Sequence, residues 1–138
     1  MTTICKNDNF HIYLNDEEKI FFVEIYDPKY NKENFILGME YIKNFWILIG
    51  NTDDKYDQVF ICNNVEVYPL EIYDTFIKLL RNLEEIFKKN LHSSCLVNNS
   101  DAMNIFRPIL NVYKAVRPFS FVNSLENGIK FVKNNPNY

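Results

Sequence analysis

Apolar residues form short runs and longer stripes along this chain, and their order predicts its secondary structure. Runs rich in aromatic and β-branched residues indicate strands. Residues 1–8 are polar by comparison, and we expect this end of the chain to be loose. Polar residues at 15–18 separate the first two runs, which we therefore expect to pair as an antiparallel hairpin. The five predicted strands are residues 10–14, 19–26, 59–62, 91–97 and 116–122.

Between the runs, apolar residues spaced three and four apart predict amphipathic helices. The longest stripe extends from Ile72 to Phe87, inside a helix expected to continue to Lys89, with Pro69 just ahead of it or in its first turn. Acidic residues lie early in this segment and basic residues lie late, which suits the helix dipole. Pro118 places the last strand at an edge of the sheet, because proline cannot donate a ladder hydrogen bond.

An earlier helix is predicted from Asn31, a good N-cap, to Ile49, with Gly50 closing it. Its last residues, 45–49, would suit a strand by composition alone. We expect a helix there, because the helical period runs unbroken from Phe35.

Two shorter helices complete the prediction. Ser100 caps one of them, which Pro108 should end near Arg107. Ser124 caps the other, which reaches about Lys133. The residues of this last helix that we expect to face inward are Leu125, Ile129 and Val132.

The predicted order of elements is therefore β-β-α-β-α-β-α-β-α. Such alternation is typical of an α/β fold, here with a mostly parallel five-stranded sheet and four helices joined by right-handed crossovers. The chain shows no repeat, low-complexity tract or linker. We expect residues 1–138 to form a single domain with an ordered core at about residues 9–134.

Composition narrows the classes of function. Hydrophobic residues make up 47% of the 138, which favours a packed core over disorder. The formal charge is −3, and lysines are spread along the chain, so nucleic-acid binding is not expected. No apolar run approaches the length of a membrane span, and the N-terminus lacks a signal sequence. Three cysteines without a framework spacing indicate reduced thiols, and we expect a cytoplasmic protein.

The residue types that carry catalysis or bind metals do not form a recognisable motif. His11 and His92 lie far apart in sequence, each in a predicted strand, and a metal site needs clustered ligands. Cys95 follows His92 by three residues, and such residues point to opposite faces of a regular strand, which argues against a nucleophile and its base. Neither a phosphate loop nor an opposed pair of carboxylates is evident. We therefore expect no catalytic activity, cofactor or metal.

The order and spacing of elements from about Phe10 to Val132 resembles a STAS domain, the module of sulphate transporters and anti-sigma-factor antagonists. The strand, loop and long helix of QVFICNNVEVYPLEIYDTFIKLLRNLEEI are similar to the family's central unit. SCLVNNSDAMNIF is similar to its next strand, loop and short helix, and FSFVNSLENGIKFV to its final strand and helix. The resemblance implies a regulatory protein-interaction domain.

One departure from the family concerns its switch. Regulatory members carry an Asp-Ser-Ser-Gly-like motif at the start of the central helix, and phosphorylation of a serine there releases the partner. The matching stretch here, from Pro69 to Ile72, contains no hydroxyl group. Glu71 falls near the phosphoserine position, where it is either a fixed negative charge or a first-turn glutamate that serves the helix dipole.

The resemblance implies docking of a protein partner by the loop and helix after the central strand. We expect no nucleic-acid or membrane partner, and a homodimer is left open. Packing of the loop is an equal interpretation of Tyr68 and Leu70. The expected partner-binding residues, with the last two from the next loop at the same carboxyl edge of the sheet, are Tyr68, Pro69, Leu70, Glu71, Tyr73, Asn98 and Asn99.

Two other functions fit the same sequence. One is a binding protein for a nucleotide or a lipid, with its cleft at that edge of the sheet. The other is a structural or self-assembling protein, since aromatic residues make up 16% of the chain and would promote association if many of them were exposed.

Overall fold

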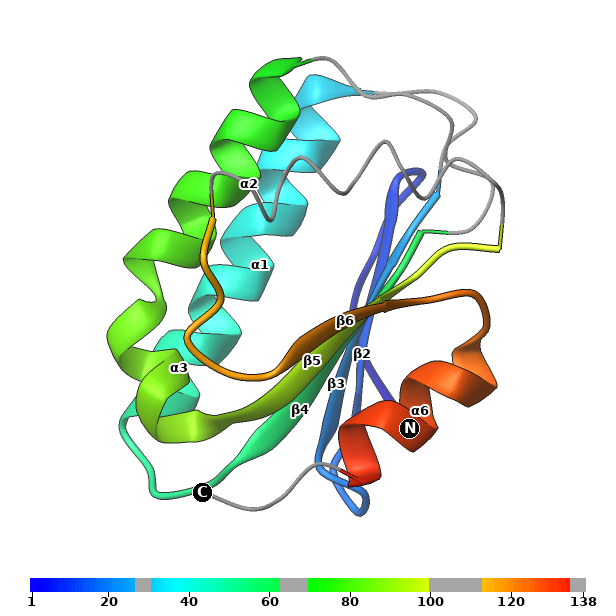
Figure 1. Ribbon diagram of the computed structural model, residues 1–138. Helices are drawn as coiled ribbons and strands as arrows, with labels where there is room; N and C mark the ends of the chain where they lie inside the picture. The colour runs from blue at the N-terminus through cyan, green and yellow to red at the C-terminus, as the bar shows by residue number, and fades with distance from the viewer. Residues whose placement is uncertain (27–30, 63–69, 100–112, 135–138) are drawn as a thin grey trace.

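A computed structural model of the chain describes residues 1–26, 31–62, 70–99 and 113–134. Within them, six strands form one mixed sheet in which the strands lie in chain order (Figure 1). The first two pairings are antiparallel and the next three are parallel. The strands are β1 Thr2–Lys6, β2 Phe10–Asn15, β3 Ile20–Ile25, β4 Tyr56–Ile61, β5 Leu91–Val97 and β6 Phe119–Val122.

The strand β1 corrects the prediction for the N-terminal end, which was expected to be loose. It pairs with β2, and its Ile4 and Cys5 pack against the larger core cluster. Two neighbouring apolar residues in a polar segment do not alternate as strand residues do, and the register of β1 shifts between Thr3 and Cys5. Among the described residues, the sheet therefore has six strands rather than five, and two antiparallel pairings make it mixed.

The predicted hairpin and edge strand are confirmed. The hairpin of β2 and β3 runs in register from Phe10 opposite Ile25 to Asn15 opposite Ile20. Strand β6 pairs with β5 alone and lies at the end of the sheet, as expected. It begins at Phe119 rather than at residue 116, so Pro118 directly precedes the strand instead of lying within it.

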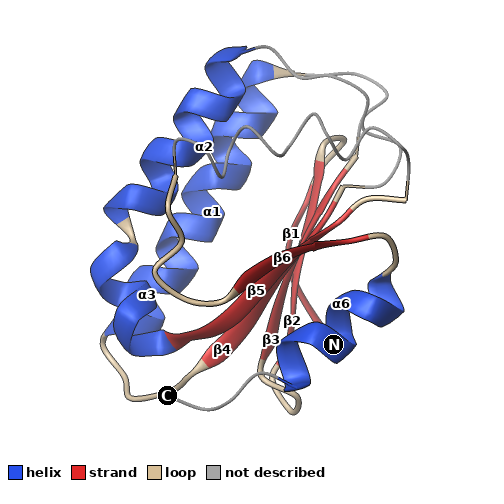
Figure 2. Ribbon diagram, in the orientation of Figure 1, coloured by secondary structure: helices blue, strands red, loops and turns tan. Residues whose placement is uncertain are grey.

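Helices cover both faces of the sheet (Figure 2). Three of them pack on one face, where they enclose the larger core cluster, and the fourth packs on the other face against β4, β5 and β6. The three are α1 Lys32–Gly50, α2 Leu70–Asn82 and α3 Glu84–Asn90, and the fourth is α6 Leu125–Asn134. The helix predicted from Ser100 lies outside the described residues.

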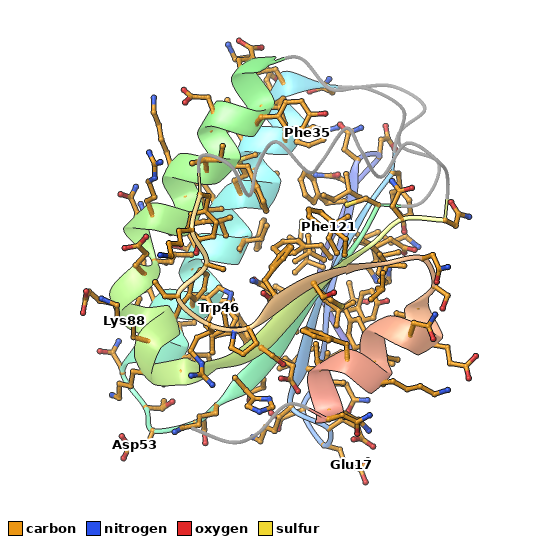
Figure 3. All side chains as sticks on the ribbon, viewed as in Figure 1. Glu17, Phe35, Trp46, Asp53, Lys88 and Phe121 are labelled. Atoms are coloured by element: carbon orange, nitrogen blue, oxygen red, sulfur yellow. The ribbon has the colours of Figure 1, made fainter. Side chains whose placement is uncertain are left out.

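Helix α1 confirms the helical prediction for residues 45–49. Asn31 caps it as expected, because its side-chain Oδ1 accepts a hydrogen bond from the backbone N–H of Asn34 at 3.0 Å. Trp46 is fully buried between α1 and the sheet, where its Nε1–H donates to Oε1 of Gln58 at 2.8 Å (Figure 3). This bond joins α1 to the central strand β4.

The long helix predicted to reach Lys89 is interrupted. The backbone N–H of Leu83 is shared between the carbonyls of Leu79 and Leu80, both at 3.2 Å, and α3 begins at the next residue. The break leaves the stripe of apolar residues on the same side, since Leu83 and Phe87 are both buried. Periodicity alone therefore could not reveal it.

The final helix confirms its predicted cap, and one of the side chains expected to face inward points out. Ser124 Oγ accepts a hydrogen bond from the backbone N–H of Asn127 at 3.1 Å. Val132 is fully buried and Ile129 is half-buried, but Leu125 is 38% exposed. Gly128 takes the inward position instead, since a Cβ there would lie 3.0 Å from atoms of Cys95 and Val97. None of the described helices is long and apolar enough to cross a membrane.

The bond between Trp46 and Gln58 yields a double-mutant prediction. Trp46→Phe removes the donor and leaves the buried amide oxygen of Gln58 without this hydrogen bond. We expect the free energy of unfolding to fall by about 1–3 kcal/mol for this reason, in addition to the loss caused by the smaller ring. Gln58→Met, which keeps the shape of the side chain, should likewise leave the buried indole N–H of Trp46 without its acceptor. The double variant should be more stable than the sum of the two losses implies, as measured by urea unfolding. Additive losses would show that the bond contributes nothing.

Candidate functional site

The carboxyl edge of the sheet was expected to bear the partner-binding residues. Tyr68 and Pro69 lie outside the described residues, and Leu70 begins α2 without a described side chain. Glu71 is exposed in the first turn of α2, and its carboxylate lies 3.8 Å from Nζ of Lys32 at the start of α1. This ion pair joins the amino-terminal ends of the two helices.

The other expected residues divide between the interior and the surface. Tyr73 is half-buried and packs against the larger core cluster, so its side chain does not share the exposure of Glu71. Asn98 is fully buried; its side-chain N–H donates to the carbonyl of Cys62 at 3.0 Å, and its backbone N–H donates to that of Val122 at 3.0 Å. It holds the ends of β4, β5 and β6 together. Asn99 is exposed.

A small apolar cavity lies beneath this edge, between the sheet and the helices α1 and α2. Its volume is about 40 Å³, whereas pockets for drug-sized ligands hold roughly 300–1,000 Å³. A nucleotide or a fatty acid does not fit between these walls as they stand. The residues that line the cavity are Phe10, Ile25, Phe35, Met39, Ile42, Phe60, Cys62, Ile72, Tyr73, Phe76 and Leu96.

The outward side of α1 is unusual because it bears large apolar side chains, as the buried side of the helix does. Of the seven large hydrophobic side chains exposed among the described residues, five belong to this helix. Their exposed fractions are 68% for Leu48, 49% for Ile36, 47% for Leu37, 42% for Ile47 and 36% for Tyr41. We name this surface the α1 outer face and define it as Ile36, Leu37, Glu40, Tyr41, Lys43, Asn44, Ile47 and Leu48.

Two open depressions continue this face toward α2. They hold about 150 and 200 Å³ and share Ile36, Met39 and Thr75, so together they form a groove along the two helices. Apolar side chains line its floor and charged side chains line its rim. The floor includes Ile36, Met39, Ile72 and Leu79, and the rim includes Lys32, Glu40, Lys43, Glu71 and Lys78.

At the amino-terminal end of β4 and β5 lies a polar cluster that the sequence did not predict. The ladder between the strands passes from Tyr56 opposite Leu91 to Gln58 opposite Ser94, so two residues of β5 face Asp57 alone. This bulge brings both side chains onto one carboxylate oxygen. Oδ1 of Asp57 lies 2.7 Å from Nδ1 of His92 and 3.0 Å from Oγ of Ser93.

The cluster is largely shielded from water, and burial dominates its electrostatics. Desolvation raises the pKa of the Asp57 carboxyl, and hydrogen bonds from His92 and Ser93 offset part of that rise. Burial, with a smaller effect from the charge of Asp57, raises the pKa of the Cys95 thiol to about 12. The thiol therefore stays protonated near neutral pH and is a poor nucleophile.

The bulge also changes the argument about His92 and Cys95. Regular alternation would place residues three apart on opposite faces, but the extra residue in β5 turns His92 toward Asp57. Cys95 belongs to the core cluster under α6, and the charge of Asp57 acts on its thiol. The two side chains are therefore on the same face, and burial of the thiol, rather than its direction, argues against a nucleophile.

The geometry of Ser93 differs from that of a catalytic triad. Its Oγ lies 3.4 Å from Nδ1 of His92, the same nitrogen that contacts Asp57, whereas a triad places the serine and the carboxylate on opposite nitrogens. Ser93 is fully buried, and its hydroxyl also lies 3.1 Å from the carbonyl of Val132 in the last turn of α6. Since last-turn carbonyls lack partners within their own helix, this contact caps α6.

A signal for the cluster was present in the sequence. Asp57 and Gln58 directly precede the apolar run that predicted the central strand, and both belong to that strand, whose six residues are all buried. Polar residues in a buried strand need partners, so they mark a hydrogen-bonded site. Within the described residues, no three histidine, cysteine or acidic side chains come together to hold a metal ion.

Comparisons with protein-family models, with curated proteins and with solved structures find no match to this chain.

Asp57→Asn should change how stability depends on pH. Folding raises the pKa of the Asp57 carboxyl, so the protonated carboxyl stabilises the folded protein. This stabilisation is fully present below about pH 4, the range in which a free carboxyl is protonated. It is lost as the pH rises through the raised pKa of the folded protein. The asparagine variant has no charge to bury. We therefore expect the wild type to lose stability relative to this variant as the pH rises, measured by urea unfolding at a series of pH values.

Ser93→Ala is the matched control for this prediction. It keeps the carboxyl and removes one hydrogen bond that lowers its pKa, so the loss of stability on raising the pH should persist and extend to higher pH. A constant difference in stability between the wild type and Asp57→Asn across this range would contradict the assignment.

Proposed function

We propose that this protein is a non-catalytic protein-interaction module that docks a partner on the α1 outer face. The observation that carries this proposal is the concentration of exposed Ile, Leu and Tyr side chains on one helix. Exposed apolar residues scattered singly are normal on a protein surface, but a contiguous group is typical of an interaction site.

The composition of α1 supports this interpretation. Its inner side buries Phe35, Ile42 and Trp46, which is sufficient to hold an amphipathic helix on a sheet. Leu48 contributes little to that packing, since it keeps 68% of its surface in water. Helical surfaces that bear large apolar side chains are typically covered, so the five such residues on the outer face favour a second layer of protein over it.

The shape of the surface favours a helical partner. The groove along α1 and α2 has an apolar floor and a rim with both signs of charge. A partner helix with apolar anchors three and four residues apart fits such a groove, and mixed charges at its margins would set its register.

The expected docking patch at the carboxyl edge stays a prediction. Glu71 belongs both to that patch and to the rim of the groove, so one partner could contact both surfaces. The relation to STAS domains, a regulatory role and a cytoplasmic location are likewise proposals that rest on the sequence. The loss of the switch serine would make docking independent of phosphorylation at that point.

Leu48→Arg tests the proposed surface. It introduces a charge at the most exposed apolar position of α1 and should leave folding intact, because the side chain contributes little to the core. We expect it to reduce recovery of the bound partner about tenfold or more in affinity purification from cells that express the protein.

Leu125→Arg is the matched control, since Leu125 is an exposed leucine on α6, at the opposite face of the sheet. It should bind the partner as the wild type does. Equal recovery with both variants, at equal melting temperatures, would show that docking does not use the α1 outer face.

A further inference from the structure

The geometry points to a second copy of this chain as an occupant of the α1 outer face. We propose that α1 pairs with α1 of the second copy in antiparallel orientation about a two-fold axis. The inference rests on the proposed function and names the partner for that surface. Its main support is a pattern on the helix in which the apolar positions are symmetric about a central pair of residues, and this central pair carries charges of opposite sign.

One line of the face has the spacing four, three, four: Ile36, Glu40, Lys43 and Ile47. A two-fold axis beside the middle of this line places Ile36 opposite Ile47 of the second copy. It also places Glu40 opposite Lys43 of that copy, and Lys43 opposite its Glu40. Along this line, the pairing forms two symmetric ion pairs between two apolar contacts, and no like charges of the line face each other.

The neighbouring line repeats this spacing in Leu37, Tyr41, Asn44 and Leu48. Its ends are apolar and its middle is formed by Tyr41 and Asn44, and its centre lies one residue from that of the first line. Rotation about the same axis therefore brings Leu37 close to Leu48 of the second copy. At each end of the contact, two apolar residues of one copy meet two of the other.

The extent of the contact is that of a weak specific dimer. From Ile36 to Leu48 the helix rises by about 18 Å, which is roughly three turns of contact on each copy. The groove beside α1 lies on the same side of the axis in both copies, so α2 would face α2. We expect a buried area near the low end of specific interfaces, on the order of 1,200 Å², and a dissociation constant on the order of 10 µM.

The edge strand β1 is a poorer surface for self-association. It is five residues long, and its register with β2 shifts between Thr3 and Cys5. Short, irregular edge strands resist pairing with a further strand, and Lys6 at the end of β1 adds a charge to that edge. A dimer that extended the sheet through β1 would also leave the α1 outer face uncovered.

Charge reversal gives a sensitive test, because each substitution occurs twice in a two-fold symmetric dimer. Glu40→Lys places a second lysine opposite Lys43 on both sides of the axis, and Lys43→Glu places two acidic pairs there. We expect each single variant to weaken the dimer about tenfold or more at low salt. The double variant restores two pairs of opposite charge and should dimerise within about threefold of the wild type.

A mixture of the two single variants provides a further test of the dimer. When they are mixed, one copy carries two lysines and the other carries two glutamates at these positions, so the mixed pair alone avoids repulsion. Sedimentation equilibrium should show a dimer in the mixture at concentrations where each single variant is monomeric. Glu126→Lys reverses an exposed charge on α6 and is the control that should leave the dimer unchanged.

Each outcome decides the inference. Dimerisation of the wild type with loss in both single variants and recovery in the double variant supports it. A wild type that remains monomeric to about 200 µM, well above the expected dissociation constant, overturns it, and so does a dimer that tolerates both reversals. If the monomeric protein still loses a different partner through Leu48→Arg, the proposed function stands without self-association. If Leu48→Arg changes neither property, both fail.

Discussion

The complete burial of β4 is the constraint on which the rest of the structure depends. All six of its residues are buried, so each face of this strand must be covered by a layer of helix. Tyr56 and Phe60 belong to the core beneath α1, α2 and α3, whereas Val59 and Ile61 belong to the core beneath α6. Without either layer, one set of these side chains would be exposed to water.

Two polar residues in this buried strand require partners, and their contacts link the strand to the helical layers on its two faces. Gln58 accepts the indole hydrogen bond from Trp46 of α1. Asp57 contacts His92 and Ser93, and Ser93 in turn reaches the carbonyl of Val132 in α6. Gln58 therefore ties the central strand directly to α1, whereas Asp57 is linked to α6 through Ser93 of β5. Because buried polar groups are costly without partners, the two contacts also fix the positions of those helices.

The parts of the fold that the sequence predicted are those with an uninterrupted pattern. The hairpin and α1 each have one clear period over at least five residues, and Ser124 and Asn31 cap helices where capping residues were expected. The features that escaped prediction are irregular: the shifted strand β1, the break at Leu83 and the bulge opposite Asp57. A single extra residue changes the face to which side chains point, and no spacing rule anticipates where it will occur.

The candidate site residues were likewise predicted only in part. Asn98 was expected to bind a partner because it follows a strand at the carboxyl edge, but the sequence did not reveal that its amide holds the carbonyl of Cys62. Phe45 and Trp46 continue the helical period that begins at Phe35, and both are buried. The next two, Ile47 and Leu48, continue the apolar run, which is why composition also suited a strand. In a helix, consecutive residues turn by about 100°, so a run of five apolar residues must place some of them in solvent.

Chemistry and docking make opposite demands on a protein surface, and the two candidate surfaces of this chain differ in that respect. The polar groups around Asp57 are buried at the bulge, where they contact one another and α6. The nearby thiol of Cys95 is protonated near neutral pH, because burial raises its pKa. The α1 outer face instead leaves apolar side chains in water, with two charges of opposite sign between them. Leu48 keeps most of its surface in water, and the other four side chains keep 36–49% of theirs. Covering them with another protein surface would therefore remove further apolar area from water. For this reason we propose docking, rather than chemistry, as the explanation for the exposed face of α1.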